Sequence, residues 1–176
     1  MKVLVLTGPE STGKSWLANE LQQRFGGIVV GEYVRHFIDS QQRDTCYADI
    51  STIARGQLAW EDEARAKRPH LLILDTHLLS NILWSYALFG DCPEWMEPAL
   101  LERAYHLHLL LDPRDVEWIS DGQRCQPELA QRVVFHQACA AWLVAHEQTV
   151  VAVAGTWSER QNEVIRRVEA WLATEE

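Results

Sequence analysis

The most informative segment of the sequence is Gly8-Pro9-Glu10-Ser11-Thr12-Gly13-Lys14-Ser15. It fills every fixed position of the pattern GxxxxGK[ST]. An apolar run at residues 2–7 precedes it, and residues 17–25, with apolar side chains at helical spacing, follow it and stop at Gly26-Gly27. We therefore expect a loop that joins a buried strand to the N-terminus of a helix.

A loop of this kind is suited to holding phosphate. Gly8 and Gly13 let successive backbone N–H groups point inward, and the helix N-terminus adds its positive dipole. Lys14 is expected to bridge the β- and γ-phosphates of ATP, and Ser15 to ligate Mg²⁺ through its hydroxyl. The predicted nucleotide contacts from this region are Gly8, Pro9, Glu10, Ser11, Thr12, Gly13, Lys14, Ser15 and Trp16.

Short apolar runs alternate with helical patterns along the rest of the chain. This alternation is typical of repeated βαβ units and of a parallel sheet buried on both faces. The sequence thus predicts an α/β P-loop NTPase fold of the nucleoside- and nucleotide-kinase kind, in a single domain over residues 1–176. The five predicted strands cover residues 2–7, 28–30, 70–74, 106–111 and 149–153.

Composition limits the partners. The 176 residues carry a net charge of −9, with a pI near 5.2, which argues against broad binding to nucleic acid or to an anionic membrane. No apolar run approaches the roughly 20 residues that span a bilayer, and the N-terminus lacks the features of a signal peptide. The four cysteines have no zinc-ligand spacing. We expect a cytoplasmic protein with reduced thiols that acts on a small molecule, without nucleic acid or membrane partners.

Two acids follow predicted strands, Asp75 after residues 70–74 and Glu32 after residues 28–30. Because parallel strands end at one edge of a sheet, both carboxylates should face the same crevice. We assign Asp75 to Mg²⁺ and Glu32 to the acceptor hydroxyl. The residues alone leave three points open: Glu32 as a solvated loop acid, Asp75 as a turn cap, and which of the two is the base.

Residues 112–127 are the least regular part of the chain and contain Arg114 and Arg124. The planar fork of arginine can hold phosphoryl oxygens, while Pro113 and Gly122 suit a segment that folds over a nucleotide. We predict a mobile lid whose two arginines contact ATP. An ordinary polar surface loop is the alternative.

Further motifs add a family resemblance. Over essentially its whole length the chain resembles the ribosylnicotinamide (nicotinamide riboside) kinase domain of NadR-type proteins. That resemblance implies dependence on ATP and Mg²⁺ and phosphorylation of the 5′-hydroxyl of nicotinamide riboside. The chain departs from the family pattern at Gly31 and His36. Besides the phosphate loop, the motifs are Glu32-Tyr33 with Arg35, Ile53 with Gly56-Gln57, Leu74-Asp75-Thr76, and Trp118 with Asp121-Gly122 and Arg124.

Nicotinamide riboside carries a positively charged ring, which favours an acidic pocket with an aromatic face. A kinase for another nucleoside or metabolite, and a regulatory ATPase without an acceptor, remain the alternatives. The oligomeric state is not predicted. The predicted catalytic residues are Lys14, Glu32, Asp75 and Arg124. The predicted substrate contacts are Glu32, Tyr33, Arg35, Asp39, Asp75 and Trp84, with Tyr33 and Trp84 as stacking surfaces and Glu32 and Asp39 near the ribose or the ring charge.

Overall fold

A five-stranded parallel sheet with the order β2-β3-β1-β4-β5 forms the centre of the computed structural model, which describes residues 1–174. The predicted fold class is confirmed, and every predicted strand is present, with three of them beginning one residue later than expected. The strands are β1 (Lys2–Thr7), β2 (Ile28–Val30), β3 (Leu71–Asp75), β4 (Leu107–Leu111) and β5 (Val150–Val153).

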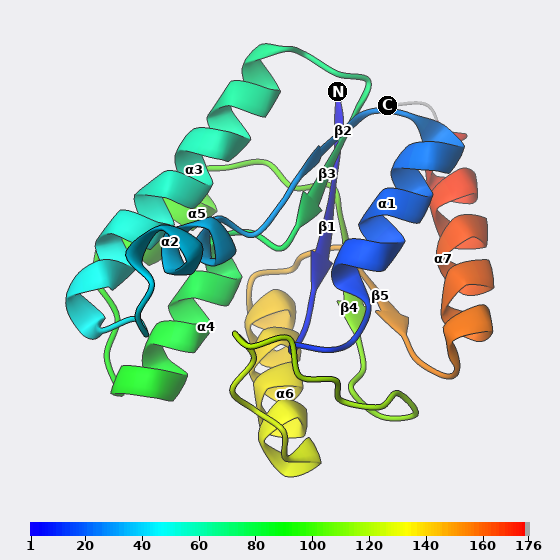
Figure 1. Cartoon of the computed structure of the whole chain (residues 1–176). Helices are drawn as coiled ribbons and strands as arrows, with labels where there is room; N and C mark the ends of the chain where they lie inside the picture. Colours follow the sequence, from blue (N-terminus) through cyan, green and yellow to red (C-terminus); the bar gives the residue numbers. More distant parts are fainter. Residues whose placement is uncertain (175–176) are drawn as a thin grey trace.

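Helices cover both faces of the sheet, as the crossover connections of parallel strands require. In Figure 1, α1 and α7 lie on one face, and α3, α4 and α6 lie on the other. The helices are α1 (Lys14–Phe25), α2 (Tyr33–Gln41), α3 (Ile50–Ala66), α4 (Leu78–Phe89), α5 (Met96–Leu101), α6 (Leu129–Ala145) and α7 (Trp157–Leu172), with a short 3₁₀ helix, η1, at Tyr47–Asp49.

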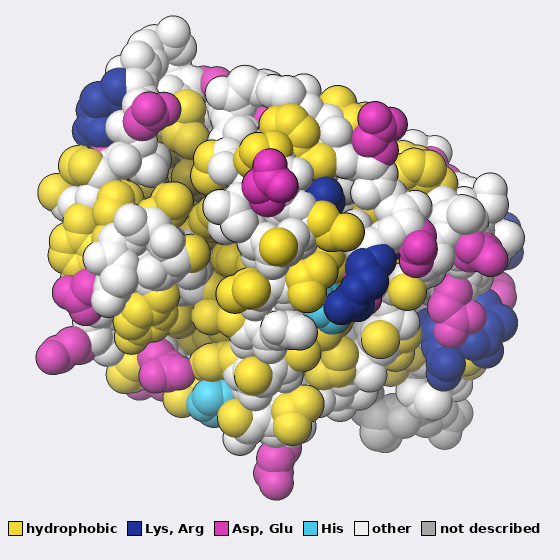
Figure 2. All heavy atoms as spheres, turned by 90° about the horizontal axis from the view of Figure 1, so that it is seen from below, with side chains coloured by type: hydrophobic (Ala, Val, Ile, Leu, Met, Phe, Trp, Pro, Cys, Tyr) yellow, Lys and Arg dark blue, Asp and Glu magenta, His cyan; other side chains and the backbone are white. Residues whose placement is uncertain are grey.

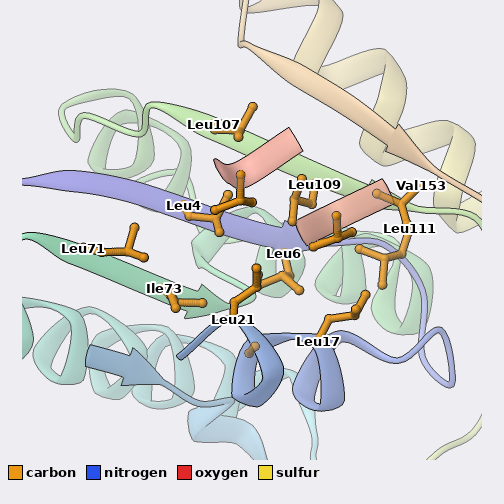
Figure 3. Packing of buried hydrophobic residues seen from close by; sticks show 13 residues of the cluster. Leu4, Leu6, Leu17, Leu21, Leu71, Ile73, Leu107, Leu109, Leu111 and Val153 are labelled. Carbon is orange, nitrogen blue, oxygen red and sulfur yellow. The ribbon is translucent and has the colours of Figure 1, made fainter. Parts of the chain in front are cut away.

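Alternate residues of each strand supply the two halves of the core. Leu4 and Leu6 of β1 point toward α1 and α7, where they pack with Leu17 and Leu21 (Figure 3). Their neighbours on β1 point to the opposite face and pack with the α3 side. Since both faces of the sheet are buried, the strands read as continuous apolar runs, which is why the sequence revealed them.

The carboxyl ends of the strands share the lower edge of the sheet in Figure 1. The phosphate loop follows β1 there, and residues 112–127 follow β4 as turns and bends without helix or strand. Figure 2 looks at this edge directly and shows a hollow lined largely by hydrophobic side chains. Within residues 1–174, no helix has the length and apolar character needed to cross a membrane.

Candidate nucleotide and acceptor site

The phosphate loop requires glycine at both ends. Gly8 (φ 131°) lies so close to the end of β4 that a Cβ atom there would be 2.6 Å from the Leu111 carbonyl oxygen. Gly13 (φ 90°) is the N-cap of α1, and its Cβ would be 2.5 Å from the ring of Trp157. Both residues have a positive φ, which side chains rarely adopt, and at both an added Cβ atom would overlap a neighbouring residue. Any side chain would therefore distort the loop.

Lys14 points back into the loop that it follows. Its ammonium donates hydrogen bonds to the carbonyl oxygens of Pro9 (2.9 Å) and Gly8 (3.2 Å). It also lies 3.9 Å from Oε1 of Glu32, and only 8% of the side chain is exposed. The Lys14 ammonium is therefore held beside the phosphate loop. Phosphate oxygens bound there could replace the carbonyl oxygens as its hydrogen-bond acceptors.

Asp75 ends β3 and is 5% exposed. Its Oδ1 has no hydrogen-bond partner within residues 1–174. Burial, followed by the nearby charge of Glu32, raises the pKa of Asp75 to about 6, while Lys14 and a hydrogen bond from the Ser15 hydroxyl act in the opposite direction. A buried carboxylate with an unused oxygen beside a hydroxyl is a donor set that fits Mg²⁺, which prefers oxygen ligands and keeps part of its shell for phosphate.

Glu32 is the N-cap residue of α2, and its side chain is 15% exposed. Oε2 accepts a 2.7 Å hydrogen bond from Nε of Arg35, while Oε1 faces Lys14. Glu32 is therefore not a solvated loop acid. The structure brings Lys14, Glu32 and Asp75 to one place, as the sequence predicts for the ends of β1, β2 and β3.

Gln57 of α3 holds the turn that carries Glu32, and it was not among the predicted site residues. Its side-chain oxygen accepts a hydrogen bond from the Tyr33 amide (2.8 Å), and its amide donates to the Gly31 carbonyl (3.0 Å). The residue is 2% exposed. Both backbone groups beside Glu32 are thus fixed from one side chain. The only sequence signal was its place in the Gly56-Gln57 pair.

A cavity of about 520 Å³ begins at the phosphate loop and extends between α2, α3 and α4. Its wall is mainly apolar. Trp84 lies in this wall, as predicted, beside Phe135 at a ring separation of 4.8 Å. Apart from loop residues 10–16, the lining is formed by Glu32, Val34, Arg35, Ile38, Thr45, Ile50, Ile53, Gln57, Thr76, Ser80, Asn81, Trp84, Leu88, Ile119, Gln123, Arg124, Cys125 and Trp157.

Six predicted contact residues lie outside this lining: Gly8, Pro9 and Asp75, whose surroundings are given above, and Tyr33, Asp39 and Arg114. The ring of Tyr33 packs on Trp60, 4.9 Å away, in space left by Gly56, where a side chain would overlap the ring. Asp39 accepts a hydrogen bond from Gln123 (2.7 Å), and Arg114 pairs with Asp112 (2.7 Å). Their contacts with a ligand stay predictions.

Residues 112–127, which we call the lid segment, lie over the phosphate loop. Glu10 accepts hydrogen bonds from Nε1 of Trp118 (2.7 Å) and from the amide of Gln126 (2.8 Å). Asp121 pairs with Arg35 of α2 (2.8 Å) and with Arg124 (3.2 Å). The segment is thereby connected to both the loop and α2, and Arg124 lies at the cavity. Its mobility stays a prediction.

This sheet order, with a phosphate loop after β1 and acids after β2 and β3, defines the class: a P-loop protein with the nucleoside- and nucleotide-kinase fold. The chain belongs to the AAA domain family, whose sequence profile matches residues 3–160.

Sequence relatives confirm the resemblance to NadR-type proteins. The chain is 24% identical over 139 residues to the trifunctional NAD biosynthesis/regulator protein NadR of Salmonella typhimurium, covering 77% of this chain and 34% of that protein. The NadR protein of Escherichia coli K12 is 25% identical over 128 residues, covering 70% and 31%. The chain thus matches about a third of the length of these curated relatives.

Solved structures share the fold. A crystal structure of NadR protein in complex with NR superposes with a TM-score of 0.80 at 21% identity, covering 99% of this chain and 52% of that one. Deoxyadenosine kinase from M. mycoides with bound dATP gives a TM-score of 0.65 at 11% identity, covering 96% and 100%. The predicted enzyme class, an ATP-dependent kinase, is consistent with these sequence and structural relatives.

Proposed function

We propose that this protein is an ATP-dependent kinase that phosphorylates the 5′-hydroxyl of nicotinamide riboside to give nicotinamide mononucleotide. One observation carries the proposal: the Glu32 carboxylate lies 3.9 Å from the Lys14 ammonium, where the phosphate loop meets a mainly apolar cavity. An acid beside the γ-phosphate position, with room for an organic acceptor, suits transfer to a hydroxyl. The NadR relatives, including one whose crystal structure is a complex with NR, support this acceptor. We expect the reaction in the cytoplasm.

The chemistry follows from the placement of the residues. Lys14 and the N-terminus of α1 would hold the β- and γ-phosphates, while Ser15 and Asp75 would ligate Mg²⁺, which supplies positive charge to the phosphate oxygens. The acceptor oxygen forms a bond to the γ-phosphorus as the bond to the β–γ bridging oxygen breaks and ADP leaves. Glu32 would accept the hydroxyl proton, directly or late in the transfer.

Part of the cavity wall fits a flat, positively charged ring. Ile38 of α2, Ile53 of α3 and Trp84 of α4 belong to the lining. An indole face attracts a pyridinium ring by a cation–π contact worth about 0.5–2 kcal/mol. The Glu32 carboxylate belongs to the same lining, but its charge is shared with Lys14 (3.9 Å) and Arg35 (2.7 Å), so the indole face is the main attraction for the ring. A neutral nucleoside would lose this contact.

The test is ADP formation with ATP, Mg²⁺ and one of nicotinamide riboside, uridine, cytidine or adenosine, followed by mass-spectrometric identification of the phosphorylated product. We expect nicotinamide riboside to react fastest and to yield the mononucleotide. A faster neutral nucleoside would make the protein a kinase for another acceptor. ADP formation that needs no nucleoside would indicate a regulatory ATPase and overturn the proposal. Lys14→Ala, purified identically, sets the background from contaminating enzymes.

A further inference from the structure

Besides Trp84, the cavity lining includes two aromatic residues, Trp16 of α1 and Trp157, which begins α7. Trp157 is 42% exposed, although most large apolar residues of this protein are covered. Trp84 and Trp157 come from α4 and α7, which lie on opposite faces of the sheet in Figure 1. Both indoles therefore line the same cavity as the phosphate loop, which follows central strand β1.

The Trp157 ring is held firmly on the side away from solvent. It meets Trp16 edge to face, with ring centroids 5.6 Å apart and an interplanar angle of 90°. It also packs directly on Gly13, as the close approach at that Cβ position requires. A capping box between Thr156 and Glu159 fixes the helix end that carries it. The ring is thus both ordered and open to a ligand.

Arg160, one turn further along α7, fixes Trp157 relative to the phosphate loop. The residue is fully buried, and its guanidinium donates to the carbonyl oxygens of Gly155 (2.7 Å), Arg114 (2.8 Å) and Thr12 (3.4 Å). These three carbonyls belong to the β5–α7 connection, the lid segment and the phosphate loop. The guanidinium also lies 6.0 Å from the Trp157 ring centroid. One buried cation therefore sets the spacing between the loop and the indole.

We propose that the base of the nucleoside triphosphate stacks on Trp157. The inference rests on the proposed function, because Glu32 places the acceptor and the transferred phosphate on the side of α2 and Trp84. The remaining phosphates, ribose and base then extend from the loop in the other direction, where Trp16 and Trp157 line the cavity and Trp157 is the more exposed of the two. Stacking of a base on such a ring is a common source of nucleotide affinity and tolerates different bases.

The test compares a ligand that has a base with one that has none. Dissociation constants for ATP and for inorganic tripolyphosphate, each with Mg²⁺ and without acceptor, would be measured by calorimetry for wild type, Trp157→Ala, Trp157→Leu and Trp157→Phe. We expect Ala and Leu to weaken ATP by about tenfold and to leave tripolyphosphate unchanged, with Phe close to wild type. Leu keeps an apolar contact with Trp16 if Ala disturbs the fold.

The controls separate stacking from a role in the loop. Tyr86→Ala removes another aromatic residue, which is 54% exposed on α4 and outside the cavity lining, and should change neither constant. Equal weakening of ATP and tripolyphosphate would mean that Trp157 acts through Gly13, and no weakening would mean that it does not meet the base. Loss with Phe equal to that with Ala would also overturn stacking. Since no acceptor is used, failure of the nicotinamide riboside assignment would not affect the result.

Discussion

The carboxylate of Glu10, in the phosphate loop, accepts a 2.7 Å hydrogen bond from the indole Nε1 of Trp118, in the lid segment. This bond, with the Gln126 amide on the same carboxylate, joins residues more than a hundred positions apart. These bonds hold the lid segment against the loop, and Arg124 lies at the cavity.

Arg124→Ala should lower kcat more than it weakens ATP binding. We expect a loss of about tenfold to a hundredfold in kcat, because a guanidinium that closes on the transferred phosphate acts chiefly in the transition state. Steady-state kinetics and a separate measurement of ATP affinity check this. Arg24→Ala, which removes an exposed arginine paired with Glu169 (3.6 Å), is the matched control and should have no effect. A loss confined to ATP affinity would contradict the lid prediction.

Lys14→Ala should abolish phosphoryl transfer and leave the fold intact. Its ammonium bonds with two loop carbonyls and faces Glu32, so little packing is lost, whereas the transferred phosphate loses a charged partner. We expect kcat/KM to fall by about a hundredfold or more. Activity and thermal unfolding are measured on the same preparation. Retained turnover in a folded variant would refute the role of the loop.

Glu32→Gln should remove most activity without weakening ATP binding. The amide can still accept the hydrogen bond from Arg35, but it cannot take a proton from the acceptor. General-base catalysis typically contributes about 10²- to 10⁴-fold. Unchanged kcat/KM would move the role to Asp75 or leave the reaction without a protein base. Asp75→Asn, tested in parallel, should instead raise the Mg²⁺ concentration needed for half-maximal activity.

Gln57→Met should impair catalysis through the position of Glu32. The methionine side chain has a similar volume but makes neither of the two hydrogen bonds to Gly31 and Tyr33. We expect kcat to fall by about tenfold with ATP affinity unchanged, and the free energy of unfolding to fall by about 1–3 kcal/mol. A drop in stability with normal kcat well below the melting temperature would show that Gln57 only supports the fold.

His108 should make the protein less stable in mild acid. Burial lowers the pKa of this ring from 6.5 to about 4, and its aromatic neighbours are His77 (5.2 Å) and Tyr105 (6.0 Å), the latter bonded to Glu61. Between these pH values the unfolded chain binds a proton that the folded protein excludes. Stability is therefore complete above about pH 6.5 and is lost as the pH falls toward 4, by about 2–3 kcal/mol.

Denaturant unfolding from pH 7 to pH 4 measures this loss. His108→Leu should make the profile less steep, because the variant has no proton to gain at this position. Some slope remains from His77, whose pKa is also lowered by burial. If the free energy of unfolding falls equally steeply with pH in the wild type and in the variant, His108 contributes nothing to the acid sensitivity.

The phosphate loop, the strands and the placement of Glu32 and Asp75 could all be predicted from the amino-acid sequence. Each of these depends on local rules: glycine spacing shapes a loop, apolar runs buried on both faces form parallel strands, and a residue after such a strand lies at the carboxyl edge of the sheet.

Contacts between segments that are distant in the sequence became visible only in the folded structure. Gln57 meets the turn at Gly31 across 26 residues, Gly56 makes room for the Tyr33 ring and turns it away from the cavity, and Arg160 ties Trp157 to the loop. A periodic pattern shows which face of a helix is buried. It does not show which neighbour covers that face, because close packing between elements selects the partner of each side chain.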